Sequence, residues 1–207
     1  MAVTRVKPPS DAHQRRKAEI LAAAGEVFYQ KGYHGASMQD IADRLEILKA
    51  GLYYYVDSKE DLLYQLAVQL TEEAFEFHCS ADAALAEADA ETRLRDFIRQ
   101  WILTRVNYES RAFLAVEQDC RQLSADRWTE VRAHRNKLRL LLKGILEQGL
   151  AEEIFDPDMN IDVVATNVFE LLVGISRWYK PSGPCSLQQL SEWYATFIIR
   201  GIMLNPG

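Results

Sequence analysis

Cysteine, glycine and proline are all scarce in this chain, and each shortage excludes a class of fold. The three cysteines, Cys79, Cys120 and Cys185, lie far apart, and no two have the Cys-x-x-Cys spacing. An odd number of distant thiols excludes a disulfide framework and predicts reduced cysteines in a cytoplasmic protein. Only ten glycines and six prolines interrupt 207 residues that are 48% hydrophobic, which favours long helices over a strand-rich fold.

Signals for membrane insertion and for catalysis are missing as well. No apolar leader opens the chain, and no membrane-length apolar run is free of charges, which predicts a soluble protein with no membrane partner. The motifs Gly-x-Ser-x-Gly, Gly-x-Gly-x-x-Gly, the P-loop and His-Glu-x-x-His do not occur. The four histidines are isolated from one another. We therefore expect no enzyme, no cofactor and no metal site.

The charge is unevenly distributed along the chain. The net charge is −6, but residues 1–60 hold nine Lys and Arg against eight Asp and Glu, and the remainder holds fifteen against twenty-two. An acidic body repels DNA, so only the N-terminal part can provide a nucleic-acid face. Its main basic cluster could contact phosphates or a minor groove, or could be a solvated terminus. The cluster consists of Arg5, Lys7, Arg15, Arg16 and Lys17.

Apolar residues recur at the spacing of an α-helix through almost the whole chain. Only residues 1–10, with two prolines and no apolar period, depart from this pattern at the start, and we interpret them as a flexible arm. The fold class is therefore all-α, with about nine helices. They are expected near residues 11–31, 37–45, 49–56, 59–78, 94–105, 113–120, 124–148, 161–179 and 186–204. Residues 81–91 form a loose connection or a short helix.

Residues that begin and end helices stand between these segments. Gly32 is expected to end the first helix in the left-handed conformation, and Gly149 is expected to end the long helix that starts at Ser124. Side-chain caps are expected at three helix starts: Ser37 with Asp40, Asn160, and Ser186 with Gln189.

Residues 37–56 have the plan of a helix-turn-helix, with a short helix, a tight turn and a second short helix behind a bracing helix. The second helix of such a motif exposes small and hydrogen-bonding side chains to a groove of DNA and buries a few apolar ones. The expected exposed set is Lys49, Ala50, Gly51, Tyr53 and Tyr54, with Leu52 and either Tyr55 or Val56 buried. Ser37 and Lys59, each at a helix N-terminus, are expected to contact phosphates.

An ordinary helical hairpin with aromatic packing is the alternative for this segment. The three adjacent tyrosines at 53–55 argue against it, because neighbouring side chains on a helix point about 100° apart and cannot all face one core. At least one ring must then be exposed, where its hydroxyl can meet a phosphate.

The same segment resembles the TetR family of one-component regulators. The resemblance covers about residues 13–64 and is carried by Phe28 to Tyr33, Ser37 with Ile41 and Ala42, Lys49 to Tyr55, and Ser58 to Leu62. It implies a helix-turn-helix head, residues 11–58, on a ligand-binding and dimerisation domain, residues 59–207. It also implies a homodimer that binds a palindromic DNA operator and is released by a small-molecule effector. The implied DNA contacts are Ser37, Lys49, Gly51, Tyr53, Tyr54 and Lys59.

Two positions depart from the family's pattern. Glu46 stands where the turn between the helices usually holds a glycine, and a positive φ there would cost about 1 kcal/mol. Leu48 stands where a capping Ser or Thr is frequent. Both changes remove groups that favour DNA binding, and Glu46 adds repulsion. We expect Glu46 to be tolerated because the turn is held from both sides.

Aromatic and cationic residues share helix faces in the body. Trp101, Arg105 and Tyr108 have the spacing i, i+4, i+7, and Arg177 and Trp178 end the penultimate helix. Cations among aromatic rings could bind an acidic apolar ligand. Alternatively, the rings on the first helix belong to the core and both arginines lie at the surface or an interface. Residues 177–184 are similar to a TetR subgroup that includes regulators of lipid and sterol catabolism, some of which sense acyl-CoA thioesters.

The last two helices are too apolar to have only one buried face. Residues 161–179 would bury one side on the body and need a cover for the other. The helices of a second subunit, 161–179 and 186–204, can supply it in an isologous four-helix interface. The alternative is that residues 161–179 form a central helix within one subunit.

Together these features predict a ligand-responsive transcriptional repressor that binds DNA as a dimer, with each recognition helix in a major groove. The alternative from another class is a helical small-molecule-binding protein or a small enzyme without DNA recognition. Activation of transcription in place of repression is left open.

Overall fold

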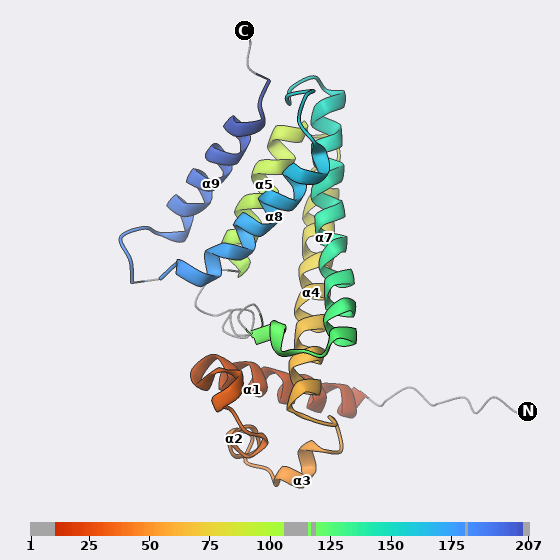
Figure 1. The fold of residues 1–207 in the computed structure, drawn as a ribbon, viewed down its shortest axis with the longest axis vertical. Helices are drawn as coiled ribbons and strands as arrows, with labels where there is room; N and C mark the ends of the chain where they lie inside the picture. Colours follow the sequence, from red (N-terminus) through yellow and green to blue (C-terminus); the bar gives the residue numbers. More distant parts are fainter. Residues whose placement is uncertain (1–10, 106–115, 117–118, 181, 205–207) are drawn as a thin grey trace, which may run out of the picture.

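The computed structural model describes residues 11–105, 116, 119–180 and 182–204, which form an all-helical fold (Figure 1). The expected all-α class is confirmed, with eight α-helices and one short 3-10 helix, η1, in this part of the chain. Their bounds are α1 Asp11–Gly35, α2 Met38–Arg44, α3 Lys49–Leu52, α4 Lys59–Ala84, α5 Ala90–Arg105, η1 Cys120–Gln122, α7 Ala125–Ala151, α8 Ile161–Trp178 and α9 Leu187–Ile202. The expected arm and most of the helix expected at 113–120 lie outside the described residues. Over those residues, no helix combines the length and apolar character that crossing a membrane requires.

Helices α1, α2 and α3 form a small head at one end of the molecule, around the first turns of α4 (Figure 1). Their apolar faces meet in a cluster that includes the buried residues Ile20, Phe28, Ile41 and Leu52. Gly32 interrupts α1 with φ 69° and ψ 161°, the positive φ expected of a glycine near a helix end. One further helical turn follows it, so α1 is kinked there and ends at Gly35, four residues beyond the expected range of 11–31.

Side chains cap the helices at the positions expected from the sequence. The Ser37 hydroxyl accepts from Asp40 N–H at 3.1 Å, and the Asp40 carboxylate accepts from Ser37 N–H at 2.8 Å, which completes a capping box on α2. Hydrogen bonds from Lys31 and from Ser37 lower the pKa of Asp40 to about 2. The expected caps at Asn160 on α8 and at Ser186 with Gln189 on α9 are present as well, and Ser58 also caps α4.

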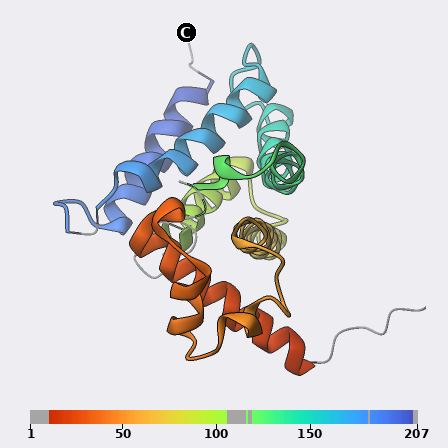
Figure 2. The same ribbon diagram turned by 60° about the horizontal axis from the view of Figure 1, so that its bottom comes forward.

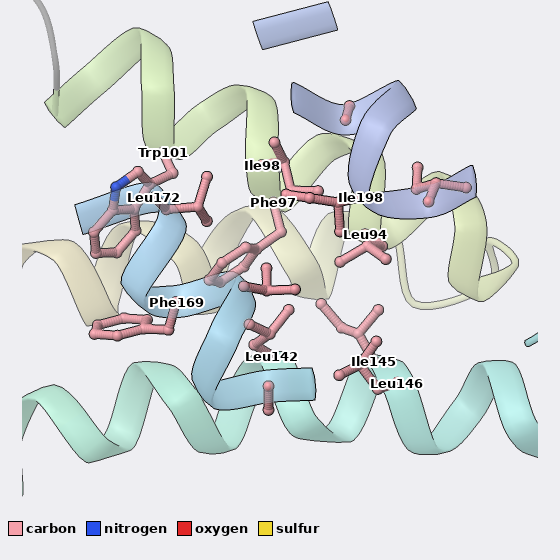
Figure 3. Packing of buried hydrophobic residues seen from close by; sticks show 14 of the residues in the cluster. Leu94, Phe97, Ile98, Trp101, Leu142, Ile145, Leu146, Phe169, Leu172 and Ile198 are labelled. Atoms are coloured by element: carbon pink, nitrogen blue, oxygen red, sulfur yellow. The ribbon is translucent and has the colours of Figure 1, made fainter. Parts of the chain in front are cut away.

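The body is built around α5, which packs against α7 and α9, while α4 and α7 lie side by side along the long axis of the molecule (Figure 1). Helix α8 packs on α7 and also contacts α5. Figure 3 shows the core where these helices meet. It includes the buried side chains Leu94, Ile98, Leu142, Ile145, Leu172 and Ile198. Each helix therefore buries one apolar face here.

A glycine of α7 has a packing role that the sequence did not reveal. The prediction that the helix ends at Gly149 is wrong, because α7 continues to Ala151 and Gly149 is buried within it. A Cβ atom at this position would lie 2.0 Å from Cδ2 of Phe155. The chain reverses after α7 through Glu153, which has φ 59°, and so places the buried Phe155 ring against the helix backbone. No side chain at position 149 can share that space.

The Gly149→Ala substitution is expected to destabilise the protein by about 1–3 kcal/mol, the usual effect of inserting an atom into a filled core. Gly144→Ala is the matched control on the same helix, because a Cβ there meets nothing within 4 Å. It should leave the free energy of unfolding unchanged or raise it by up to about 1 kcal/mol, since alanine favours a helix interior. Urea unfolding followed by circular dichroism compares the two, and equal stabilities would contradict the packing account.

Candidate nucleic-acid interface and effector site

Helices α2 and α3 meet in a tight turn at the end of the molecule opposite the C-terminus (Figure 1), and Figure 2 turns this end forward. Glu46 in the turn has φ 54°, the positive value considered for it from the sequence. Glu46 N–H donates to Asp43 O at 3.1 Å, and Ile47 N–H donates to Ala42 O at 3.0 Å. These bonds hold the backbone on both sides of the strained residue.

Helix α3 is shorter than expected. The prediction that it continues to Val56 is wrong, because α3 ends at Leu52 and the following residues form a turn. The N–H groups of Tyr55 and Val56 both donate to Leu52 O and close that turn. Leu48 stands at the N-cap of α3, where no side chain caps the helix.

The side chains expected to contact DNA from α3 and its following turn are all on the outer surface of the head. Tyr54 is 75% exposed and Tyr53 is 48% exposed, whereas Leu52 is fully buried. The other exposed members of the set are Lys49, Ala50 and Gly51. The Tyr54 and Tyr55 rings meet edge-on with 5.0 Å between centroids, and both lie near the His13 ring of α1, at 5.7 Å and 4.8 Å. Tyr55 is the less exposed of the two. The surface therefore combines a cation, two phenol hydroxyls and two small residues.

The remaining two candidates, Ser37 and Lys59, are engaged within the protein. The Ser37 hydroxyl donates to Asp40 Oδ2 at 2.8 Å. The Lys59 ammonium donates to the backbone oxygens of Tyr33 at 2.7 Å and Ala36 at 2.9 Å, and it lies over the Tyr33 ring. Lys59 thus supports the carbonyl end of α1, a role that the sequence analysis missed. A phosphate contact by either residue would compete with these bonds.

Part of the basic cluster at the start of the chain can be placed. Arg15, Arg16 and Lys17 lie in the first turns of α1, and Arg15 is exposed. Arg16 pairs with Glu19 one turn further on, with 2.5 Å between the nitrogen and the oxygen. The two arm residues, Arg5 and Lys7, lie outside the described part of the chain.

The candidate ligand-binding residues lie partly in the core and partly at the surface. Trp101 and Arg105 of α5 are buried, and burial lowers the pKa of Arg105. Arg177 and Trp178 at the end of α8 are exposed, and the Trp178 ring stacks on Tyr194 of α9 at 6.5 Å. Tyr108 lies outside the described residues. A ligand-binding role for any of these five residues stays a prediction.

A buried histidine accompanies Trp101, and the sequence analysis did not identify it as part of a site. His78 of α4 is 2% exposed, and its ring stacks on Trp101 at 5.6 Å and lies 4.6 Å from Phe97. Burial and, to a smaller extent, the charge of Arg105 lower the pKa of His78 to about 4, so the ring is neutral at pH 7. Its Nε2 has no hydrogen-bond partner among the residues described. The sequence does contain one indication that His78 is buried, because His78 follows the apolar Ala74 by four residues and so lies on the same face of α4.

The outer faces of α8 and α9 are apolar and exposed. Five large side chains form what we term the α8–α9 face: Val163, Leu171 and Trp178 on α8, and Trp193 and Phe197 on α9. Phe197 is 71% exposed. The opposite face of α8, with Ala165 and Leu172, is buried in the body. Helix α8 is therefore a surface helix of this subunit, which contradicts the alternative of a central helix, and exposed patches of this kind mark interaction surfaces.

An ion pair at the start of α4 joins the head to α7. Arg127 Nη2 of α7 donates to Asp61 Oδ1 of α4 at 3.0 Å, and Asp61 is only 7% exposed. Three further hydrogen bonds connect the same regions: Tyr64 to Glu130, Ser124 N–H to Glu60, and Tyr33 N–H to Asp119. The sequence analysis missed all four, because each links residues more than sixty positions apart.

Metal-ligating side chains are not gathered anywhere in the ranges that the structure covers. No group of three or more His, Cys, Asp or Glu residues there could hold a metal ion. The three cysteines are free thiols.

Comparison with known proteins covers both parts of the chain. Residues 20–66 match the family model described as "Bacterial regulatory proteins, tetR family". Residues 87–202, more than half of the chain, match the model described as "Tetracyclin repressor-like, C-terminal domain".

Individual relatives agree with these matches. The HTH-type transcriptional repressor KstR2 of Mycobacterium tuberculosis is 25% identical over 187 residues, which are 90% of this chain and 92% of KstR2. The TetR family transcriptional regulator PfmR from Thermus thermophilus superposes with a TM-score of 0.75 at 27% identity, over 87% of this chain and 97% of PfmR. AibR in complex with isovaleryl coenzyme A and operator DNA shares the fold, with a TM-score of 0.78 at 24% identity over 88% of this chain and 97% of AibR.

The family suggested by residues 13–64 is therefore found over nearly the whole chain. The tight turn between α2 and α3 carries an exposed polar surface, and a helical body lies behind it. The chain belongs to the tetR family of bacterial regulatory proteins and is a ligand-responsive transcriptional repressor of that family.

Proposed function

We propose that this repressor binds its operator through the exposed surface of α3 and the turn after it. One observation carries the proposal: Lys49, Tyr53 and Tyr54 are exposed beside the small residues Ala50 and Gly51. Small residues let a helix approach the floor of a major groove, while lysine and tyrosine can donate to the phosphates at its edges. The acidic body repels DNA and so favours binding through the head.

The homodimer interface in this proposal is the α8–α9 face. Pairing of this face with the same face of a second subunit would form a four-helix interface with two-fold symmetry. It would remove apolar surface from water, which contributes about 25 cal/mol for each Å² buried. The two-fold axis relates the two heads, so the operator would consist of inverted half-sites.

The effector in this proposal is an acidic, apolar small molecule, with an acyl-coenzyme A as the candidate. The buried Trp101 ring and the Arg105 guanidinium of α5 offer an aromatic surface and a cation within the body. The AibR complex with isovaleryl coenzyme A supports this ligand class, and the relative KstR2 is a ketosteroid transcriptional regulator. Arg177 and Trp178 would then serve a polar part of the ligand that reaches the surface.

Effector binding would reach the head through the Asp61–Arg127 ion pair. Arg127 belongs to α7, which also lines the body core through Leu142, and Asp61 belongs to the first turn of α4, directly behind the head. An effector that shifts α7 relative to α4 would change the separation of the two heads in the dimer. Effector and operator would then weaken each other's binding by the same factor.

Tyr54→Phe and Lys49→Gln are expected to weaken binding to duplex DNA from the region upstream of the repressor's own gene. Each substitution removes one phosphate contact, so we expect about a tenfold loss of affinity from each. Lys49→Gln should also reduce the slope of log affinity against log salt concentration by about 1. Fluorescence anisotropy of a labelled duplex at several salt concentrations measures both effects.

Tyr55→Phe is the matched control for the DNA experiment, because Tyr55 is half-buried whereas the neighbouring Tyr54 is 75% exposed. Its affinity should equal that of the unchanged protein. Equal losses for Tyr54→Phe and Tyr55→Phe, or no loss for Lys49→Gln, would contradict the assignment of this surface to DNA.

Asp61→Asn and Arg127→Gln are expected to have non-additive effects on the free energy of unfolding. The pair joins two elements and is partly buried, with side-chain exposures of 10% for Asp61 and 29% for Arg127. We expect an interaction energy of about 1–2 kcal/mol from the double-mutant cycle in urea. The exposed Arg16–Glu19 pair within α1 is the control and should give less than about 0.5 kcal/mol. Strict additivity at Asp61 and Arg127 would mean that the pair does not couple the head to α7.

A further inference from the structure

A groove of about 480 Å³ lies on the surface of the body between α7 and α8. Six of its lining residues carry the argument: Trp128, Arg132, Arg135 and Arg139 on α7, and Phe169 and Glu170 on α8. Phe169 connects the groove to the interior, because its ring meets Trp101 edge-on at 5.2 Å. Figure 3 shows this contact, with Phe169 projecting from α8 toward α7.

The charge of the groove is opposite to that of the body. Residues 61–207 hold fifteen Lys and Arg against twenty-two Asp and Glu, whereas the groove holds three arginines against one glutamate, Glu170. Arg132, Arg135 and Arg139 follow one another at spacings of three and four residues, which places them along one face of α7. At 1.5 Å per residue, the first and the last are separated by roughly 10 Å along the helix axis. A ligand with several separated negative charges fits this row.

The arginines at the two ends of the row are available to a ligand. Arg132 is exposed and makes no hydrogen bond or ion pair with any residue in the described ranges. Arg139 Nε donates to Asn136 Oδ1 at 2.9 Å. Arg139 also lies 3.5 Å from an Asp162 oxygen, but Lys143 holds the same carboxylate oxygen at 2.8 Å, so the charge of Arg139 is only partly balanced. Arg132 can therefore accept an anionic partner without the loss of an internal bond, and Arg139 can do so through its terminal nitrogens while Nε stays bonded to Asn136.

The middle arginine is held in place beside an aromatic wall. Arg135 lies over the Trp128 ring at 5.3 Å and donates to Cys120 Sγ at 3.4 Å. A guanidinium oriented in this way loses little side-chain freedom when an anion arrives. The groove thus offers cations, an aromatic ring at the end nearest the start of α7, and an apolar ring on α8.

We propose that this groove, the α7 arginine groove, binds the phosphate groups of a nucleotide. Guanidinium groups match phosphate oxygens through paired hydrogen bonds, and an aromatic wall suits a base. The shared chemistry belongs both to a free nucleotide and to the adenosine phosphate part of coenzyme A. If the ligand is a coenzyme A, the groove would hold its phosphate groups, and the rest of the ligand would extend past Phe169 toward Trp101 in the core. That case rests on the effector class proposed above.

The experiment is isothermal titration of the full-length protein with five probes: coenzyme A, adenosine 3′,5′-bisphosphate, ADP, pantetheine and pyrophosphate. We expect the nucleotides to bind and pantetheine, which has no phosphate, to bind at least tenfold more weakly. Arg132→Gln should weaken nucleotide binding about tenfold, and the Arg132→Gln, Arg139→Gln double variant should weaken it further. Because Arg132 makes no bond within the described protein, its substitution should leave the melting temperature unchanged.

Lys137→Gln is the matched control on the same helix. Lys137 is exposed but faces Phe75 of α4, 5.9 Å from its ring centroid, and does not line the groove. The Lys137→Gln variant should bind nucleotides with the same affinity as the unchanged protein. Tighter binding of coenzyme A than of ADP would identify a coenzyme A thioester as the source of the phosphates, and equal binding would identify a free nucleotide.

Four results would overturn the proposal: no binding of any nucleotide, unchanged binding by Arg132→Gln, equal losses for Lys137→Gln, or pyrophosphate binding as tight as that of the nucleotides. Operator binding, measured on the same samples, separates this inference from the proposed function. If the protein binds duplex DNA through Lys49 but binds no nucleotide, only the proposal for the α7 arginine groove is contradicted. If it binds nucleotides but no duplex DNA, only the proposed role of α3 is contradicted.

Discussion

Two long helices pass through both hydrophobic cores of this protein, and the rest of the structure depends on that sharing. Helix α4 contributes Leu62 to the head cluster and Ala74 to the body cluster, and α7 contributes Val131 to the first and Leu142 to the second. Because packed cores deform little, the head cannot turn on the body unless these helices tilt or slide. The Asp61–Arg127 pair fastens the two helices where they leave the head.

The head and the body present different kinds of side chain at their surfaces. The head presents hydroxyls, a lysine and small residues beside the exposed Leu48, whereas Leu52 is buried. The body presents an apolar face on α8 and α9, an aromatic interior around Trp101 and a basic groove on α7. We propose a different class of partner for each surface: duplex DNA, a second subunit, and a ligand with an apolar and a phosphorylated part.

Local features of this fold could be predicted from the sequence, and long-range ones could not. The capping boxes at Ser37 and Ser186 and the positive φ of Gly32 depend on residues a few positions apart, and all three are confirmed. The helical periods also predict which side of α3 is exposed. Periodicity alone extends α3 too far, because the chain leaves the helix at Leu52 in a turn that the N–H groups of Tyr55 and Val56 close.

Contacts between distant segments account for the other differences between the structure and the expectations from the sequence. Glycine commonly ends helices, which is why the sequence indicates a helix end at Gly149, but its lack of a side chain serves the Phe155 ring. The position of Lys59 at a helix start favours a DNA contact, but the α1 carbonyls lie within its reach. The division of the chain at residue 58 stays a prediction, and the core of the head extends beyond it into α4.

The most direct test of the account is a selection of sequences bound by the full-length repressor from a pool of random duplexes. Two heads related by a two-fold axis should select inverted half-sites whose centres lie about one helical turn, or a whole number of turns, apart, near 34–36 Å for one turn. Substitution of Lys49 or Tyr54 should remove the enrichment. A single asymmetric half-site, or no enriched sequence, would contradict the claim that a symmetric pair of α3 surfaces recognises the operator.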